Sequence, residues 1–135
     1  MTTTPPTAET LNVRLAASHG STLGAERNIL DFTEDDTVTI NQSNTIAKEL
    51  AGAATDQSVN INSYVDTCKL ITILDRGGTG FKVGFASGGT KARVGPNKAF
   101  VVMWNSTVTP PTLYLDNEHA TDTAFLEIGI GGSSS

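Results

Sequence analysis

The fold is decided by the stretch CKLITIL, residues 68–74, which is followed by the turn DRGGTG and by FKVGF, residues 81–85. Apolar side chains on both faces of the first segment predict a central strand that is covered on each side. The glycine-rich turn favours a tight reversal. The second segment alternates apolar residues with Lys82 and Gly84, as a strand with one buried face does. This unit predicts a β protein.

The composition of the whole chain agrees with an all-β fold. Its 135 residues are enough for one domain. Thr occurs 20 times, and a chain rich in β-branched residues and turn formers is a poor helix former. Turn signals recur at intervals that indicate about eight strands, so we expect an antiparallel β-sandwich that is jelly-roll-like.

The two ends of the chain differ from its middle. Residues 1–10, MTTTPPTAET, are polar and without periodicity, which predicts an extended N-terminal arm. Residues 11–130 are expected to form the sandwich, with a first strand over residues 11–17. Residues 131–135, GGSSS, predict a flexible tail.

Two inner segments lead to further expectations. The segment 44–54 has apolar residues at helical spacing, and we prefer a short helical turn there, with an irregular strand as the alternative. The segment AFVVMW, residues 99–104, is the most apolar of the chain and is expected at the centre of the core.

The charges are unevenly distributed along the chain. The net charge is −5, which disfavours binding to nucleic acid or to an anionic membrane. Residues 67–98 nevertheless carry six basic side chains and one acidic side chain. Residues 99–135 carry no basic side chain and four acidic ones. Charge segregation favours contacts with copies or partners through complementary patches, and solvated strand faces are the alternative. The candidate patch consists of Lys82, Lys91, Arg93 and Lys98, with Glu34, Asp35 and Asp36 as complementary acids.

The sequence offers little support for catalysis or for a bound cofactor. The single cysteine, Cys68, excludes an intrachain disulfide and a Cys-based zinc site, and we interpret it as a core residue. Glu34 to Asp36, or Asp116, Glu118, His119 and Asp122, are possible cation ligands, but solvated loop charges are the default interpretation. The glycine-rich segments do not match a phosphate-binding loop. We therefore expect no enzyme, no metal and no cofactor.

No targeting segment is expected. The start MTTTPP has neither basic residues nor an apolar stretch, so the sequence predicts no secretion signal. No apolar run approaches the roughly 20 residues of a membrane span.

The C-terminal half resembles a type of small virion structural protein of tailed bacteriophages. The resemblance is a pattern of strands and turns over about half of the chain. It consists of an apolar strand that ends in Asp75-Arg76-Gly77-Gly78, then Phe81-Lys82-Val83-Gly84, then Val94-Gly95-Pro96-Asn97-Lys98-Ala99-Phe100, then Leu113-Tyr114-Leu115 and a closing strand over residues 124–130.

The resemblance implies a capsid decoration (cement) protein. Such a protein, made in the host cytoplasm, would sit on the virion's capsid surface as a homotrimer and join neighbouring subunits of the major capsid protein. The arm would supply the capsid contact, through Thr2, Thr3, Thr4, Pro5, Pro6 and Leu11. A tail, neck or fibre component is one alternative. A carbohydrate-binding sandwich with an exposed Tyr64 or Tyr114 is another.

Overall fold

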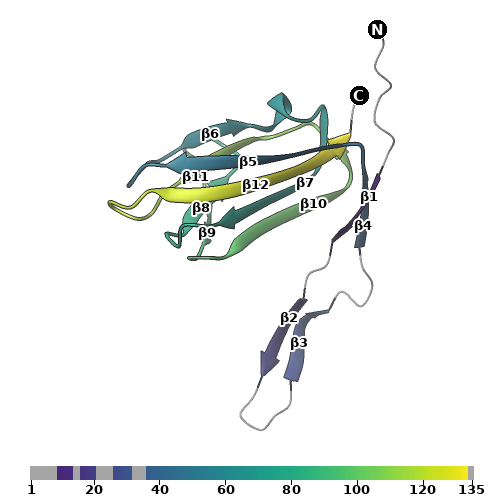
Figure 1. Ribbon diagram of the computed structural model, residues 1–135, viewed down its shortest axis with the longest axis horizontal. Helices are drawn as coiled ribbons and strands as arrows, with labels where there is room; N and C mark the ends of the chain where they lie inside the picture. Colours follow the sequence, from purple (N-terminus) through teal and green to yellow (C-terminus); the bar gives the residue numbers. More distant parts are fainter. Residues whose placement is uncertain (1–8, 14–15, 21–25, 32–35, 134–135) are drawn as a thin grey trace.

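The computed structural model describes residues 9–13, 16–20, 26–31 and 36–133 (Figure 1). In this part of the chain it contains strands and one short 3-10 turn, η1 (Ile61–Ser63). The strands are β1 (Glu9–Val13), β2 (Ala16–Gly20), β3 (Glu26–Asp31), β4 (Asp36–Ile40), β5 (Gln42–Leu50), β6 (Gln57–Asn60), β7 (Thr67–Asp75), β8 (Phe81–Gly84), β9 (Ala92–Val94), β10 (Ala99–Val108), β11 (Thr112–Asp116) and β12 (Ala124–Ser133).

Two antiparallel four-stranded sheets form the body of the protein. One, the β7 sheet, has the order β10-β7-β12-β5, and the other, the β11 sheet, has the order β6-β11-β8-β9. From β5 onward the chain alternates between the two sheets, except at the hairpin β8–β9. These are the connections of a jelly roll. The predicted all-β antiparallel sandwich is confirmed.

The space between the sheets is filled by aliphatic side chains. Ile71 and Ile73 of β7 face Leu113 and Leu115 of β11, and all four are fully buried together with Phe81. Burying one such side chain contributes about 1.5–3 kcal/mol. Cys68 is also fully buried here, in the core position that its sequence context predicts. Among the described residues, the buried polar side chains are Asp75 and Asn117.

Asp75 explains the glycine-rich turn. Its carboxylate accepts backbone N–H bonds from Gly77 at 3.0 Å, Gly78 at 3.1 Å, Gly80 at 2.8 Å and Asn97 at 3.0 Å. Burial would raise the pKa of Asp75, but these N–H groups outweigh it and lower the pKa. Gly78 and Gly80 have φ values of 77° and 74°, a backbone conformation that residues with a side chain rarely adopt. One carboxylate thus ties the β7–β8 turn to the β9–β10 turn.

Asn117 has the same role for the other two connections at this end of the sandwich. Its amide donates to the carbonyls of Leu50 at 3.2 Å, Ala51 at 3.0 Å and Asp122 at 2.7 Å. Its own oxygen accepts the His119 N–H at 3.0 Å. The β5–β6 and β11–β12 connections are therefore fixed to each other by one buried side chain.

The strands described before Gln42 form a ribbon rather than part of the sandwich. β1 pairs with β4, and β2 pairs with β3. These four strands, β1 to β4, are called the β1–β4 ribbon, and they extend away from the two sheets (Figure 1). The predicted single strand over residues 11–17 is wrong, because β1 and β2 are separate strands of the ribbon and the sandwich begins at Gln42. The predicted arm, residues 1–10, overlaps the start of the ribbon at Glu9.

The ribbon is joined to the sandwich at Ile40. A methyl group on Gly131 would lie 3.5 Å from two carbons of the Ile40 side chain, and 3.7 Å from Leu70 Cβ. Ile40 is 8% exposed, and the Asn41 N–H donates to the Gly132 carbonyl at 3.0 Å. The base of the ribbon therefore packs on the outer face of the β7 sheet.

Three further expectations are wrong. The segment 44–54 is not a helical turn but follows the strand alternative, since residues 44–50 belong to β5 and every residue from Gln42 to Leu50 pairs with β12. The predicted tail contributes Gly131–Ser133 to β12, where Gly132 lies so close to the Thr67 carbonyl that no side chain fits. The segment AFVVMW lies in β10 at an edge of the β7 sheet, not at the centre of the core.

Candidate functional site

The basic residues predicted to form a patch lie mostly on the outer face of the β11 sheet. Lys82 of β8 and Arg93 of β9 are directly opposite each other in the strand register. Both bind the Glu118 carboxylate, with Lys82 Nζ at 3.3 Å and an Arg93 Nη at 2.8 Å from Oε1. One carboxylate from the β11–β12 connection therefore compensates two of the predicted cations.

Lys91 is held more tightly than these two. Its side chain is 9% exposed, and its Nζ lies 2.9 Å from Asp56 Oδ1 and 3.5 Å from Asp116 Oδ1. A methyl group on Gly84 would lie 2.9 Å from Lys91 Cγ, so the glycine lets the lysine stem cross the sheet. The hydrogen bond to Asp56 raises the pKa of Lys91 despite its burial.

Asp56 also fixes the loop between β8 and β9, residues 85–91. Its carboxylate accepts the Ser87 hydroxyl at 2.6 Å and the Gly88 N–H at 3.0 Å. The bonds from Ser87, Lys91 and Gly88 lower the pKa of Asp56 to about 2. This loop is therefore held across the outer face of the β11 sheet by one ionised carboxylate.

The structure brings the predicted patch together only in part. Lys82, Lys91 and Arg93 are paired with Asp56, Asp116 and Glu118, whereas Lys98 has no ion-pair partner among the described residues. The proposed complementary acids are elsewhere. Asp36 begins β4, opposite Val13, and Glu34 and Asp35 lie outside the described residues.

The arm residues can be placed only in one case. Leu11 lies in β1 opposite Val38 of β4. The remaining candidates, Thr2, Thr3, Thr4, Pro5 and Pro6, lie outside the described residues.

The residues considered for chemistry form no metal or catalytic cluster in the part of the chain that the structure describes. Asp116 and Glu118 bind lysine or arginine, and His119 Nδ1 accepts the Asp122 N–H at 2.9 Å. Within the described ranges no three His, Cys, Asp or Glu side chains gather as metal ligands would. Burial raises the pKa of the Cys68 thiol. No helix in the described ranges is both long and apolar enough to span a membrane.

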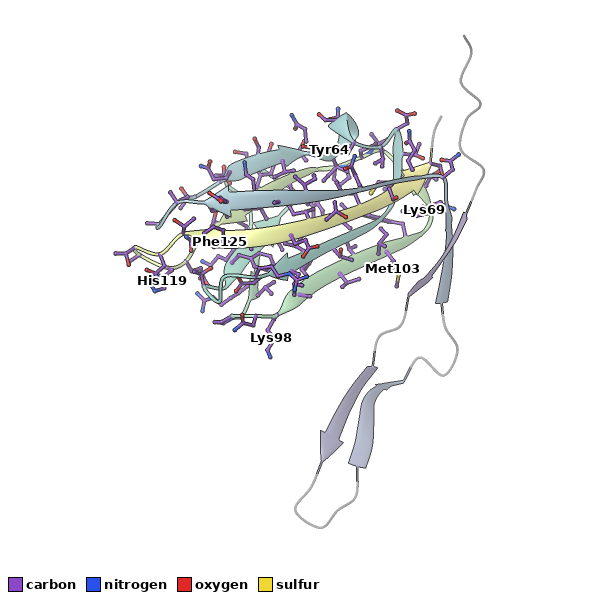
Figure 2. All side chains as sticks on the ribbon, viewed as in Figure 1. Tyr64, Lys69, Lys98, Met103, His119 and Phe125 are labelled. Atoms are coloured by element: carbon purple, nitrogen blue, oxygen red, sulfur yellow. The ribbon has the colours of Figure 1, made fainter. Side chains whose placement is uncertain are left out.

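The outer face of the β7 sheet is the surface that the sequence reasoning missed. Register places Leu70 and Leu74 of β7 beside Met103 and Ala99 of β10 on this face, since their neighbours Ile71 and Ile73 point into the core. Phe125 of β12 is 46% exposed (Figure 2). A hollow on this face is lined by Thr45, Thr72, Leu74, Arg76, Glu127 and Gly129.

The signal for this face was present in CKLITIL. Apolar residues on both faces of β7 predicted cover on both sides, and the core supplies only the inner one. Leu70, which lies beside Gly131 near the base of the ribbon, is 7% exposed, but Leu74 is only partly buried. This face also carries the Arg76–Glu127 ion pair at 2.7 Å and the exposed Glu49, which lies opposite Phe125 in the strand register. The face therefore carries apolar side chains that are incompletely covered within the described chain.

Comparisons with known proteins find similar solved structures but no family. No protein-family model matches the chain, and no curated protein matches it. It is similar to a de novo designed double-stranded β-helix, with a TM-score of 0.46 and 15% identity over 64% of this chain and 97% of that chain. It is also similar to a protein of Bacillus endospore appendages, which form a family of disulfide-linked pili, with a TM-score of 0.39 and 17% identity over 69% and 88% of the two chains.

Proposed function

We propose that this chain is a structural subunit of a multi-copy assembly and that it decorates the capsid of a tailed bacteriophage. The observation that carries the proposal is the β1–β4 ribbon, which extends from a compact sandwich (Figure 1). Among the described residues, its strands pair only with one another.

A ribbon of this kind needs a partner surface. A two-stranded β-ribbon without further packing is only marginally stable in water. Its outer edges present unpaired N–H and C=O groups, which can add to the edge of a sheet in another protein. Ile40 anchors the ribbon on the sandwich at one end, so the rest can reach a neighbouring subunit.

The sandwich itself is suited to a structural role. Its interior is packed with aliphatic side chains, and its buried polar groups in the described ranges, Asp75 and Asn117, are used to hold turns. One outer face offers incompletely covered apolar side chains, and the other offers internally compensated charges. A subunit that engages several capsid sites at once gains avidity from weak single contacts.

Removal of the ribbon tests the proposal. A variant that begins at Ile40 keeps the anchor residue and the whole sandwich. We expect it to fold, as judged by circular dichroism, but no longer to cosediment with purified phage heads, whereas the complete chain cosediments in hundreds of copies. Glu49→Gln is a matched control, because it changes one exposed charge of the sandwich outside the candidate patch and leaves the ribbon intact.

The counts of bound copies separate the alternatives. A complete chain that binds only in a few copies indicates a tail, neck or fibre component. Full binding by the variant that begins at Ile40 would remove the ribbon from the capsid contact.

A further inference from the structure

Among the described residues, strand β10 has one unpaired edge, and its two faces are only partly covered, although Phe100, Val102 and Trp104 pack against the core. In the described chain it pairs only with β7, through Ala99–Leu74 to Met103–Leu70, and a bulge follows Met103. The five residues Phe100, Val101, Val102, Met103 and Trp104 are all apolar and all only partly buried. In a strand that is covered only on its inner face, alternate residues would be fully buried, so the sandwich leaves both faces of β10 partly open.

The opposite edge of the same sheet is protected. β5 carries Lys48 and Glu49, and its outward residues are polar or small. Charged side chains on an edge strand prevent it from pairing with other chains. By contrast, residues 99–115 contain no Asp, Glu, Lys, Arg or His, and this is the longest such stretch of the chain. β10 therefore lacks the protection that β5 has.

We propose that β10 pairs antiparallel with β10 of a second copy of this chain, so that two β7 sheets join into one continuous sheet. The chain has a net charge of −5, so two copies repel each other wherever their acids meet. An uncharged edge avoids this repulsion. The contact adds main-chain hydrogen bonds at the edge and removes partly exposed apolar side chains from water.

The register of the contact follows from the regular part of β10. The bulge after Met103 limits that part to Ala99–Met103, and its midpoint is Val101. An antiparallel pair about this midpoint places Val101 opposite the second copy's Val101, and Phe100 opposite its Val102. Apolar and β-branched residues then face each other on both sides of the sheet, which stabilises cross-strand pairs.

A second copy fits this edge better than the ribbon does. Residues 1–41 carry six acidic and two basic side chains, and β10 has no cation to compensate them. The β10 segment, in contrast, is complementary to itself. The contact makes a twofold dimer the smallest assembly, in place of the homotrimer that the resemblance implies. It does not depend on capsid binding, so a chain that dimerises but binds no heads loses only the proposed function.

Light scattering on the complete chain, together with one pair of variants, tests the contact. Val101→Lys places like charges opposite each other on the dimer axis, and we expect the dimer dissociation constant to rise at least about tenfold. Ala47→Lys is the matched control on the outer side of β5 and should leave the dimer unchanged. Circular dichroism checks that both variants fold.

A crosslink supplies the second measurement. Directly opposite residues of an antiparallel pair have Cα atoms about 4.5–5.5 Å apart, which suits a disulfide. Val101→Cys should therefore form a covalent dimer under mild oxidation, whereas Ala47→Cys should not. The buried Cys68 is common to both variants. The proposal would be overturned by a monomer or by a trimer. It would also be overturned by a dimer that Val101→Lys does not weaken and that Val101→Cys does not crosslink.

Discussion

The sandwich and the ribbon are built from similar residues but are stabilised differently. Both contain β-branched residues in period-two patterns, as in VNI, residues 59–61, and TVTI, residues 37–40. In the sandwich, the apolar residues of two sheets bury each other. In the ribbon, the pairs β1–β4 and β2–β3 have no second sheet among the described residues. A strand pattern therefore predicts a strand, but the second layer decides whether that strand belongs to a stable core.

The largest expected effect separates the two regions directly. Phe81→Ala removes a fully buried ring from the middle of the core, and we expect a loss of about 3–5 kcal/mol in the free energy of unfolding. Removal of residues 1–39 should change it by less than about 1 kcal/mol, because no core side chain of the sandwich is lost. Urea denaturation of both variants measures the contrast, and a large loss in the second variant would show that the ribbon is part of the core.

Asp75 tests whether the turns of the sandwich depend on one buried group. Asp75→Ala leaves four backbone N–H groups without their carboxylate acceptor. We expect a loss of about 2–3 kcal/mol in the free energy of unfolding. Asp122→Ala, in an exposed loop, is the control and should cost far less. Equal losses in the two variants would contradict the role assigned to Asp75.

Gly132 tests the junction between the two regions. An alanine there would meet the Thr67 carbonyl, a backbone group that cannot move without shifting β7. We expect Gly132→Ala to lower the free energy of unfolding by about 1–3 kcal/mol. At Gly95 a methyl group would meet only Lys98 Cγ, at 3.7 Å, so Gly95→Ala is the matched control. A neutral Gly132→Ala would mean that the end of β12 is free to rearrange.

The features that sequence could predict are those that local pattern decides. The alternation of Phe81 and Val83 and the apolar run of β7 gave the strands, and together with the turn spacing they gave the fold class. The position of AFVVMW could not be predicted, because an apolar strand has the same pattern at an edge as at the centre. Its place depends on strand order, which is set by contacts distant in sequence.

The candidate site was predictable only as a set of charges. The sequence showed that Lys82, Lys91 and Arg93 are close along the chain, but not that acids from the β5–β6 and β11–β12 connections compensate them. Asp56 is 31 residues from Ser87 in sequence, yet it accepts the Ser87 hydroxyl. Only the jelly-roll connections bring such segments together.

The smallest expected effect concerns the loop at residues 85–91, which, like the ribbon, lies outside the core. Unlike the ribbon, it is tied to the sandwich by the Asp56 carboxylate, whose pKa falls from 3.8 to about 2 on folding. The stabilisation of the folded protein by this ionised carboxylate is complete above pH 3.8. Below pH 3.8 the unfolded chain binds the proton more readily than the folded chain does, so the stabilisation decreases. It is lost as the pH falls through about 2. Asp56→Asn should therefore destabilise the protein near neutral pH, with a difference from the unchanged chain that shrinks between these two values.

Urea denaturation of both proteins at about pH 6 and about pH 2 measures this difference. Glu49→Gln, at an exposed position of β5 in the other sheet, is the control and should show no comparable change. A difference that is independent of pH would mean that the loop is held by the Ser87 and Gly88 hydrogen bonds alone, without a contribution from the charge on Asp56. The loop and the ribbon would then differ in packing and not in electrostatics.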